Sequence, residues 1–347
     1  MVSAADPGPV GAVLADGRLP LPWLAAPLAA ALAQPGHALL LVGAPGVGAL
    51  SLQLTLAQAW LCEADAAAGG PRPCGQCTAC RLFQARTHPD LKLLLPETLR
   101  IALGWAEPGL DSEGGKHKPS RQIRVDEVRA AIEWIVKTTS RGRAKVLVLH
   151  PAEALNPIGA NALLKTLEEP PAGARLLLSC SDPEHLLPTV RSRCQRLNLP
   201  APGAAEATAW LEQQGVADPA ALLAACAGRP LDALALHQDR VDASAWAAWP
   251  AALARGQAQA WAGWPLARTL DAMQKLCHDL MARQVGGAPC YFPAQALPPV
   301  GGGIAPLLAW SAELGRVARQ AEHPWQEALL VDALATQGRE ALATLAR

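Results

Sequence analysis

Four cysteines in the first quarter of the chain have the spacing of metal ligands. Cys74, Cys77 and Cys80 lie three residues apart, and Cys62 lies a short way upstream. The two-residue gaps allow neighbouring sulfurs to bind one ion, and four thiolates complete the tetrahedral shell of a structural zinc site. An iron–sulfur cluster also uses four cysteines, and a loop without metal is the third alternative. We expect structural Zn²⁺, because the pattern offers no open coordination position for catalysis.

A glycine-rich turn follows an apolar run and precedes a helical pattern. The run Ala38–Val42 leads into the sequence GAPGVGALS, which ends at Ser51. Strand, glycine turn and helix form the setting of a phosphate-binding loop. Gly43, Gly46 and Gly48 stand where such a loop requires residues without side chains.

The side chains that handle the charge of a nucleotide are missing from this setting. Ala49 stands where the lysine of the loop is expected, and Leu50 where a hydroxyl residue would bind magnesium. The run Lys145–Leu149 has the place of the second strand of such a site. His150 and Pro151 follow it, where acidic residues would hold the metal and polarise water. The sequence therefore predicts no ATP hydrolysis, while weak binding to backbone N–H groups stays open.

Charge and cysteine content narrow the classes of protein to consider. The 347 residues have a net charge of zero, which argues against a protein held to nucleic acid mainly by bulk charge. A local basic stretch, Arg121–Lys145, is compatible with contacts to a DNA backbone, and a solvated helix face explains it equally well. Nine cysteines in such a chain favour reduced or metal-bound thiols over a disulfide framework.

The first residues show no secretory signal pattern, and we expect a cytoplasmic protein. The stretch from Leu19 to Cys62 contains no Asp, Glu, Lys or Arg, and this uncharged stretch is long enough for a membrane span. Several prolines and Gly36 interrupt this stretch, so we expect a buried strand with flanking helices and no membrane partner.

Apolar runs alternate with helical patterns up to about residue 199. We expect strands at Ala38–Val42, Leu91–Leu95, Lys145–Leu149 and Arg175–Cys180, with helices beginning near Trp23, Leu52, Val125 and Asn156. Alternation of this kind predicts an α/β domain with a mostly parallel sheet covered by helices on both faces. The stretches 66–80 and 96–120 are rich in Gly, Pro and polar residues and are expected to be loops.

Beyond residue 199 only helical patterns are found. Three short helices are expected between 204 and 237, followed by longer segments rich in Ala, Leu and Trp. We therefore divide the chain into an α/β domain at 1–199 with a zinc-binding insertion at 62–80, a small helical domain at 200–242 and a helical C-terminal domain at 243–347.

Several stretches together resemble one known family. They are the cysteine cluster, Thr87–Asp90, Gln122–Arg129, Asn161–Pro171 and Arg191–Cys194. Over about residues 20–240 the chain resembles bacterial clamp-loader subunits of the AAA+ class, and the degenerate phosphate loop resembles the delta-prime type. The resemblance implies an AAA+ core, a small helical lid domain and an all-α collar for oligomerisation.

The resemblance also implies a role for the motif Ser192-Arg193-Cys194. In this family the motif supplies an arginine finger in trans to the ATP site of a neighbouring gamma/tau subunit. A guanidinium there stabilises the negative charge that develops on the γ-phosphate. The simpler alternative for Arg193 is an ion pair with a nearby carboxylate. The chain also departs from the family's Gly-x-x-Arg pattern, in which the arginine senses nucleotide, because Leu231 stands in place of that arginine. This departure is consistent with a subunit that does not use ATP.

The resemblance implies gamma/tau and delta subunits, the beta sliding clamp and primed DNA as partners. The expected function is that of a non-hydrolysing subunit of the replicative clamp loader. Two alternatives stay open. One is an active gamma/tau-type ATPase, and the other is a stand-alone zinc-containing nucleic-acid-binding protein.

Overall fold

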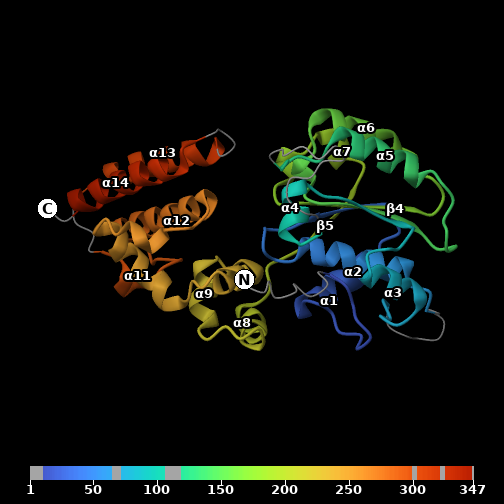
Figure 1. Ribbon diagram of the computed structural model, residues 1–347, viewed down its shortest axis with the longest axis horizontal. Helices are drawn as coiled ribbons and strands as arrows, with labels where there is room; N and C mark the ends of the chain where they lie inside the picture. The colour runs from blue at the N-terminus through green and yellow to red at the C-terminus, as the bar shows by residue number, and fades with distance from the viewer. Residues whose placement is uncertain (1–10, 65–71, 106–118, 299–302, 321–324, 346–347) are drawn as a thin grey trace. The chain divides into compact units, whose positions relative to one another are not determined.

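The four apolar runs expected as strands join a fifth strand in one parallel sheet (Figure 1). The computed structural model describes residues 11–64, 72–105, 119–298, 303–320 and 325–345. Within them the strand order is β2-β3-β4-β1-β5, and every pair is parallel. The strands are β1 (Ala38–Val42), β2 (Leu91–Leu94), β3 (Lys145–Leu149), β4 (Ala174–Cys180) and β5 (Gln195–Asn198).

Helices cover both faces of the sheet, which explains why the strands are apolar without alternation. On one face, Leu40, Leu147 and Leu176 pack in a core shared with α5 (Val125–Ile135) and α6 (Pro157–Glu168). On the other face, α2 (Ala49–Leu61) contacts β1, β3 and β4. In Figure 1, α5 and α6 lie above the sheet and α2 lies below it. The α/β core with two covered faces is confirmed.

Local signals define α6 at both ends. Asn156 is its N-cap, and its side chain accepts a hydrogen bond from Gly159 N at 2.8 Å. Pro157 occupies the first turn, where its missing N–H costs nothing. At the other end Glu169 leaves the helical conformation, with φ −126° and ψ 73°, because the proline that follows disfavours it.

The expectation of loops at 66–80 and 96–120 was wrong in part. Helix α3 (Thr78–Gln84) begins inside the first stretch, with the Cys77 thiol capping its N-terminus by accepting from Cys80 N. Helix α4 (Glu97–Ala102) lies in the second stretch, where Glu97 accepts a bond from Ser120 N. The cap of α3 is local, whereas the partner of Glu97 lies 23 positions away, where a local pattern does not display it. The rest of the two loops, 65–71 and 106–118, lies outside the described residues.

Strand β5 was also not expected, because its sequence is short and polar. It forms by pairing with β1, so that Leu40 lies beside Arg196. The remaining short elements of this half are α1 (Ala25–Leu32) and α7 (Pro188–Arg191), with single 3₁₀ turns at Pro22–Leu24, Ala152–Ala154 and Pro183–His185.

The chain divides into two compact units, Met1–Pro202 and Gly203–Arg347. The described residues of the second unit are helical: α8 (Ala204–Gln213), α9 (Pro219–Ala225), α10 (Pro230–Gln238), α11 (Ala243–Ala254), α12 (Leu266–Gln284), α13 (Ala305–Arg319) and α14 (Glu327–Leu345), with 3₁₀ turns at Ala258–Trp261 and Ala294–Ala296. This unit contains both the predicted lid and the predicted collar. Their separation at residue 242 stays a prediction.

Aromatic side chains form much of the core of the second unit. Trp246 stacks on Phe292 with ring centroids 4.7 Å apart, and Trp249 packs among Trp261, Trp264 and the same Phe292. Trp246 and Trp249 are almost completely buried, so they act as packing residues. Within the described ranges no single helix is long and apolar enough to cross a membrane, and only the sharply bent pair α9 and α10 reaches that length together.

A buried carboxylate, Asp90, ties the start of β3 to the turn before β2. Its oxygens accept from Ser140 N at 2.9 and 3.0 Å and from Arg141 N at 3.0 Å. Lys145 Nζ lies 3.7 Å away and is also buried, above the ring of Trp134. Each charge therefore depends on the other for a partner.

We expect Asp90→Ala to lower the free energy of unfolding by about 3–5 kcal/mol, because it leaves the buried Lys145 ammonium without an opposite charge and two N–H groups without acceptors. Urea unfolding followed by circular dichroism measures this. The control is Asp16→Ala, which removes an exposed carboxylate from the same unit. Equal losses in the two variants would contradict the proposed dependence.

Candidate functional site

The turn between β1 and α2 contains the three glycines that the sequence assigned to a phosphate-binding loop. Gly46 and Gly48 have φ of +75° and +102°, in the left-handed region that favours glycine. A Cβ at Gly43 would lie 2.9 Å from Leu199 O, and one at Gly48 would collide with the side chain of Leu21. Conformation and close packing both require glycine here.

The first turn of α2 offers no side chain for a nucleotide or its metal. Leu50 is buried in the protein, and Ala49 has no polar atom on its side chain. Val47 in the loop is fully buried, and its carbonyl accepts from Trp23 Nε1 at 2.8 Å. Ala49 and Leu50, which stand in place of the expected lysine and magnesium ligand, therefore lie among apolar side chains.

A chain of hydrogen bonds occupies the strand end where acidic residues would bind magnesium. His150 Nδ1 lies 2.5 Å from Ser179 Oγ, and Ser179 Oγ donates to Gln53 Oε1 at 3.1 Å. Because the hydroxyl donates to Gln53, it accepts from the imidazole. Gln53 Nε2 donates to Leu149 O at 3.1 Å and Leu177 O at 3.0 Å. Gln53, Ser179 and His150 thus satisfy one another and two strand carbonyls without a metal ion.

His150 is neutral in this position. Burial lowers the pKa of its imidazole to about 4, although the carboxylate of Glu153 opposes the shift. Glu153 Oε1 accepts from Ser181 N at 2.6 Å, Ser181 Oγ at 2.8 Å and Asp182 N at 3.1 Å. The Glu153 carboxylate therefore caps the turn after β4. The sequence places Glu153 too far beyond β3 to be one of the acidic residues of a metal site.

Sequence reasoning missed Gln53 and Ser179. Gln53 is fully buried on α2, which also buries Ser51, Thr55 and Gln58, and Ser179 is buried within the apolar strand β4. A polar residue at a position expected to be buried was the available signal. The sequence did not reveal the hydrogen-bond partners of these two residues, because the partners lie on elements that only the fold brings together.

The four predicted metal ligands converge. Their sulfurs all lie within 4.8 Å of one another. Cys62 Sγ is 3.9 Å from Cys77 Sγ, and Cys74 Sγ is 4.0 Å from Cys80 Sγ. Four sulfurs at zinc–sulfur distances of about 2.3 Å in a tetrahedron lie about 3.8 Å apart. The donor set and spacing fit Zn²⁺.

Backbone N–H groups point at the same sulfurs. Cys77 N donates to Cys74 Sγ at 3.4 Å, Cys74 N to Cys62 Sγ at 3.5 Å and Glu63 N to Cys77 Sγ at 3.4 Å. Such donors stabilise thiolates. Burial raises the pKa of Cys62 and of Cys80, so a cation is needed to keep all four sulfurs ionised. The cluster joins the end of α2 to the start of α3.

Arg193 lies in the turn after α7, with its side chain 31% exposed. Its Nε donates to Glu168 Oε1 at 2.6 Å, and its Nη1 donates to Thr189 O at 2.8 Å. The carboxylate partner that the simpler alternative requires is therefore present. Ser192 is exposed, and Cys194 is a half-buried thiol whose pKa burial raises to about 12.

The predicted sites lie apart from one another. Among the described residues, no hydrogen bond or ion pair joins the glycine loop to the cysteine cluster or to Arg193. In the second unit, Leu231 offers no charge, and the nearby Arg229 is paired with Asp232 at 2.9 Å. The structure thus shows separate sites rather than one catalytic centre.

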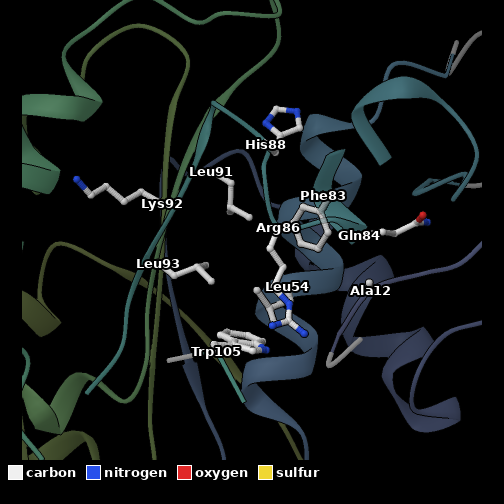
Figure 2. Close-up of a pocket in the computed structure, with 10 residues that line it drawn as sticks. All are labelled: Ala12, Leu54, Phe83, Gln84, Arg86, His88, Leu91, Lys92, Leu93 and Trp105. Atoms are coloured by element: carbon white, nitrogen blue, oxygen red, sulfur yellow. The ribbon is translucent and has the colours of Figure 1, made fainter. Parts of the chain in front are cut away.

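A cavity of about 240 Å³ lies beside the edge strand β2 (Figure 2). Its lining is mostly apolar, and it consists of Ala12, Leu54, Phe83, Gln84, Arg86, His88, Leu91, Lys92, Leu93 and Trp105. The guanidinium of Arg86 lies 4.9 Å from the centre of the Trp105 ring. None of the predicted site residues lines this cavity, so it is not the phosphate site.

Comparisons with known proteins identify the family of the chain. Residues 28–203 match the family described as "DNA polymerase III, delta subunit". The chain is 42% identical over 209 residues to DNA polymerase III subunit delta' of Pseudomonas aeruginosa, covering 59% of this chain and 57% of that protein. It is 39% identical over 205 residues to the delta' subunit of Escherichia coli K12, with 58% and 54% covered. The chain therefore spans little more than half the length of these relatives.

More distant similarity extends to other subunits. The tau subunit of Salmonella typhimurium is 33% identical over 165 residues, which cover 48% of this chain and 22% of that protein. A solved structure of a DNA polymerase III gamma subunit-related protein from Thermotoga maritima covers 92% of this chain and 99% of its own, with 16% identity and a TM-score of 0.46.

The buried His150 predicts a pH dependence of stability. Its pKa of about 4 in the folded chain lies below the unfolded value of about 6.5, so the unfolded chain binds more protons between these values. Stability should fall as the pH drops from about 6.5 to about 4, by about 3 kcal/mol from this residue.

We expect His150→Gln to reduce the slope of unfolding free energy against pH in this range, measured by urea unfolding at intervals from pH 7 to 4.5. His185→Gln, which alters an exposed histidine, is the control. His88 also has its pKa lowered by burial and remains in all three proteins. Parallel slopes in the three proteins would contradict the burial of a neutral His150.

Proposed function

The chain belongs to the DNA polymerase III delta-subunit family as a delta'-type member, and from this premise we propose that it is a clamp-loader subunit that does not hydrolyse ATP. It would assemble with gamma/tau and delta subunits and help to place the beta sliding clamp on primed DNA. We propose the cytoplasm, where replication takes place, as its location.

The main support for the proposed lack of hydrolysis is the chain of hydrogen bonds from His150 through Ser179 to Gln53. Hydrolysis of a nucleotide requires a lysine, a metal ion and a residue that orients water. Here a neutral imidazole takes the place of the acidic pair, and Leu50 takes the place of the metal-binding hydroxyl. These features argue against the alternative of an active gamma/tau-type ATPase.

The glycine loop remains useful as a scaffold in this proposal. Gly43, Gly46 and Gly48 set the connection from β1 to α2, and α2 in turn carries Gln53 and the zinc ligand Cys62 at its end. The fold of an ATPase is kept while its own nucleotide chemistry is lost.

Arg193 is the residue that we assign to a neighbour's ATP site. Its motif matches the family's arginine finger, and its side chain is partly exposed on the first unit. Phosphoryl transfer spreads negative charge over the γ-phosphate oxygens, and a guanidinium supplied in trans stabilises that charge. Ser192 and Cys194 would hold the turn that presents it.

Structural zinc is part of the same proposal. Cys62, Cys74, Cys77 and Cys80 would hold the ion, which would supply the positive charge that four thiolates need. With no open position in the shell, its effect would be to join α2 to α3 rather than to assist catalysis.

The first test replaces Arg193 by Ala in the full chain, assembled with the cognate gamma/tau and delta subunits. We expect assembly to be unchanged and ATP turnover at the neighbouring site to fall about 10³-fold or more, because the charge on the γ-phosphate loses its partner. Clamp loading on primed DNA should fall with it. The control is Arg196→Ala, an exposed arginine on β5. Normal clamp loading by Arg193→Ala would reject the assignment.

The second test concerns the metal. We expect the purified chain to contain about one zinc ion, and Cys77→Ser to reduce this to near zero and lower the melting temperature, because a three-sulfur shell binds zinc weakly. Native mass spectrometry and elemental analysis measure the metal. Cys290→Ser, a change at an exposed cysteine outside the cluster, should keep it. Zinc retained in full by Cys77→Ser, or iron in its place, would contradict the proposal.

A further inference from the structure

The guanidinium of Arg193 is held on one side by groups of its own chain. Glu168 Oε1 accepts from Arg193 Nε at 2.6 Å and also from Nη2. Thr189 O accepts from Nη1 at 2.8 Å. An arginine has five N–H donors in one plane, so these bonds use three of them.

Nη1 also donates to Ser192 Oγ, in a longer hydrogen bond of 3.3 Å. One N–H of Nη2 has no further partner among the described residues. A guanidinium binds a phosphate through two N–H groups, so this N–H is one donor for it and the long bond to the hydroxyl would be exchanged for the second. Glu168 contacts Nε and Nη2 along one side of the guanidinium and leaves this N–H available.

The position of Glu168 is set by the end of α6. It is the last residue of that helix, which begins at the capped Asn156 and ends because Glu169 precedes two prolines. Helix α6 packs against α7, which contains Thr189 and leads into the turn that carries Arg193. A guanidinium near a helix C-terminus is also favoured by the helix dipole. The carboxylate thus stands on a rigid element rather than on a loop.

We propose that Glu168 is a positioning residue that orients Arg193 for an anionic phosphate group of the neighbouring subunit's nucleotide. This inference rests on the proposed role of Arg193 in trans. An exposed ion pair contributes little to folding. Its value here is that it removes the rotational freedom of a long side chain before the subunits meet, so the donors need no reorganisation during the reaction.

The adjacent Glu169 provides a matched control. It is exposed and its carboxylate has no hydrogen-bond or ion-pair partner in the described part of the chain. Glu168→Gln and Glu169→Gln change charge and hydrogen-bonding capacity equally, one residue apart. Both variants would be assembled as full chains with the cognate gamma/tau and delta subunits, and kcat and KM for ATP measured on the complex.

We expect Glu168→Gln to lower kcat by about 10- to 100-fold, the effect of a small misplacement of a reacting group, with KM unchanged. Glu169→Gln should match the unaltered chain, and the melting temperatures of the two variants should be equal. Glu168→Asp, which keeps the charge on a shorter side chain, should recover part of the lost kcat.

A second comparison tests whether Glu168 acts through Arg193. In a chain that already carries Arg193→Ala, adding Glu168→Gln should change nothing further. A further loss in that background, a normal kcat for Glu168→Gln alone, or a raised kcat that indicates a restraining contact would each overturn the positioning role. Normal turnover by Arg193→Ala alone is a different result, since it would reject the proposed function of Arg193 and the inference with it.

Discussion

The carbonyl and side-chain groups buried at the carboxyl ends of β3 and β4 must all have hydrogen-bond partners, and the structure depends on how that requirement is met. Gln53 satisfies it from α2 by donating to Leu149 O and Leu177 O while accepting from Ser179. Through these hydrogen bonds the Gln53 amide joins α2, the helix after the glycine loop, to β3 and β4 of the sheet. These buried groups therefore have protein partners for their hydrogen bonds.

The proposed loss of nucleotide hydrolysis has a physical argument beyond the missing side chains. His150 is buried with its pKa lowered to about 4, so it brings no charge to the strand end. Leu50 belongs to the core. A lysine at position 49 would therefore place a cation beside a strand end that His150 and Pro151 follow in place of an acidic pair. In our proposal the chemistry of this chain lies in Arg193, at a surface position that only a second subunit can use.

Much of the fold was predictable from the sequence because its signals are local. Apolar runs defined β1 and β3 at both ends, and Asn156 with Pro157 marked the start of α6. The exceptions have different causes. Helix α3 begins with a local cap from the Cys77 thiol, which the sequence pattern assigns to metal binding alone. Strand β5 is a polar segment that becomes a strand only beside β1, and a partner so distant in sequence leaves no local pattern.

The sequence by itself determined the residue types and therefore the kinds of chemistry available: four thiols with metal spacing, a glycine turn without its lysine, and an arginine in a family motif. The tertiary structure decided which groups meet. It brought Gln53 and Ser179 to His150, brought the four sulfurs together, and placed Glu168 beside Arg193. The physical reason is that hydrogen bonds and ion pairs require contact within a few ångströms. The residues that make these contacts are separated in the chain, by 126 positions for Gln53 and Ser179, and only folding brings them together.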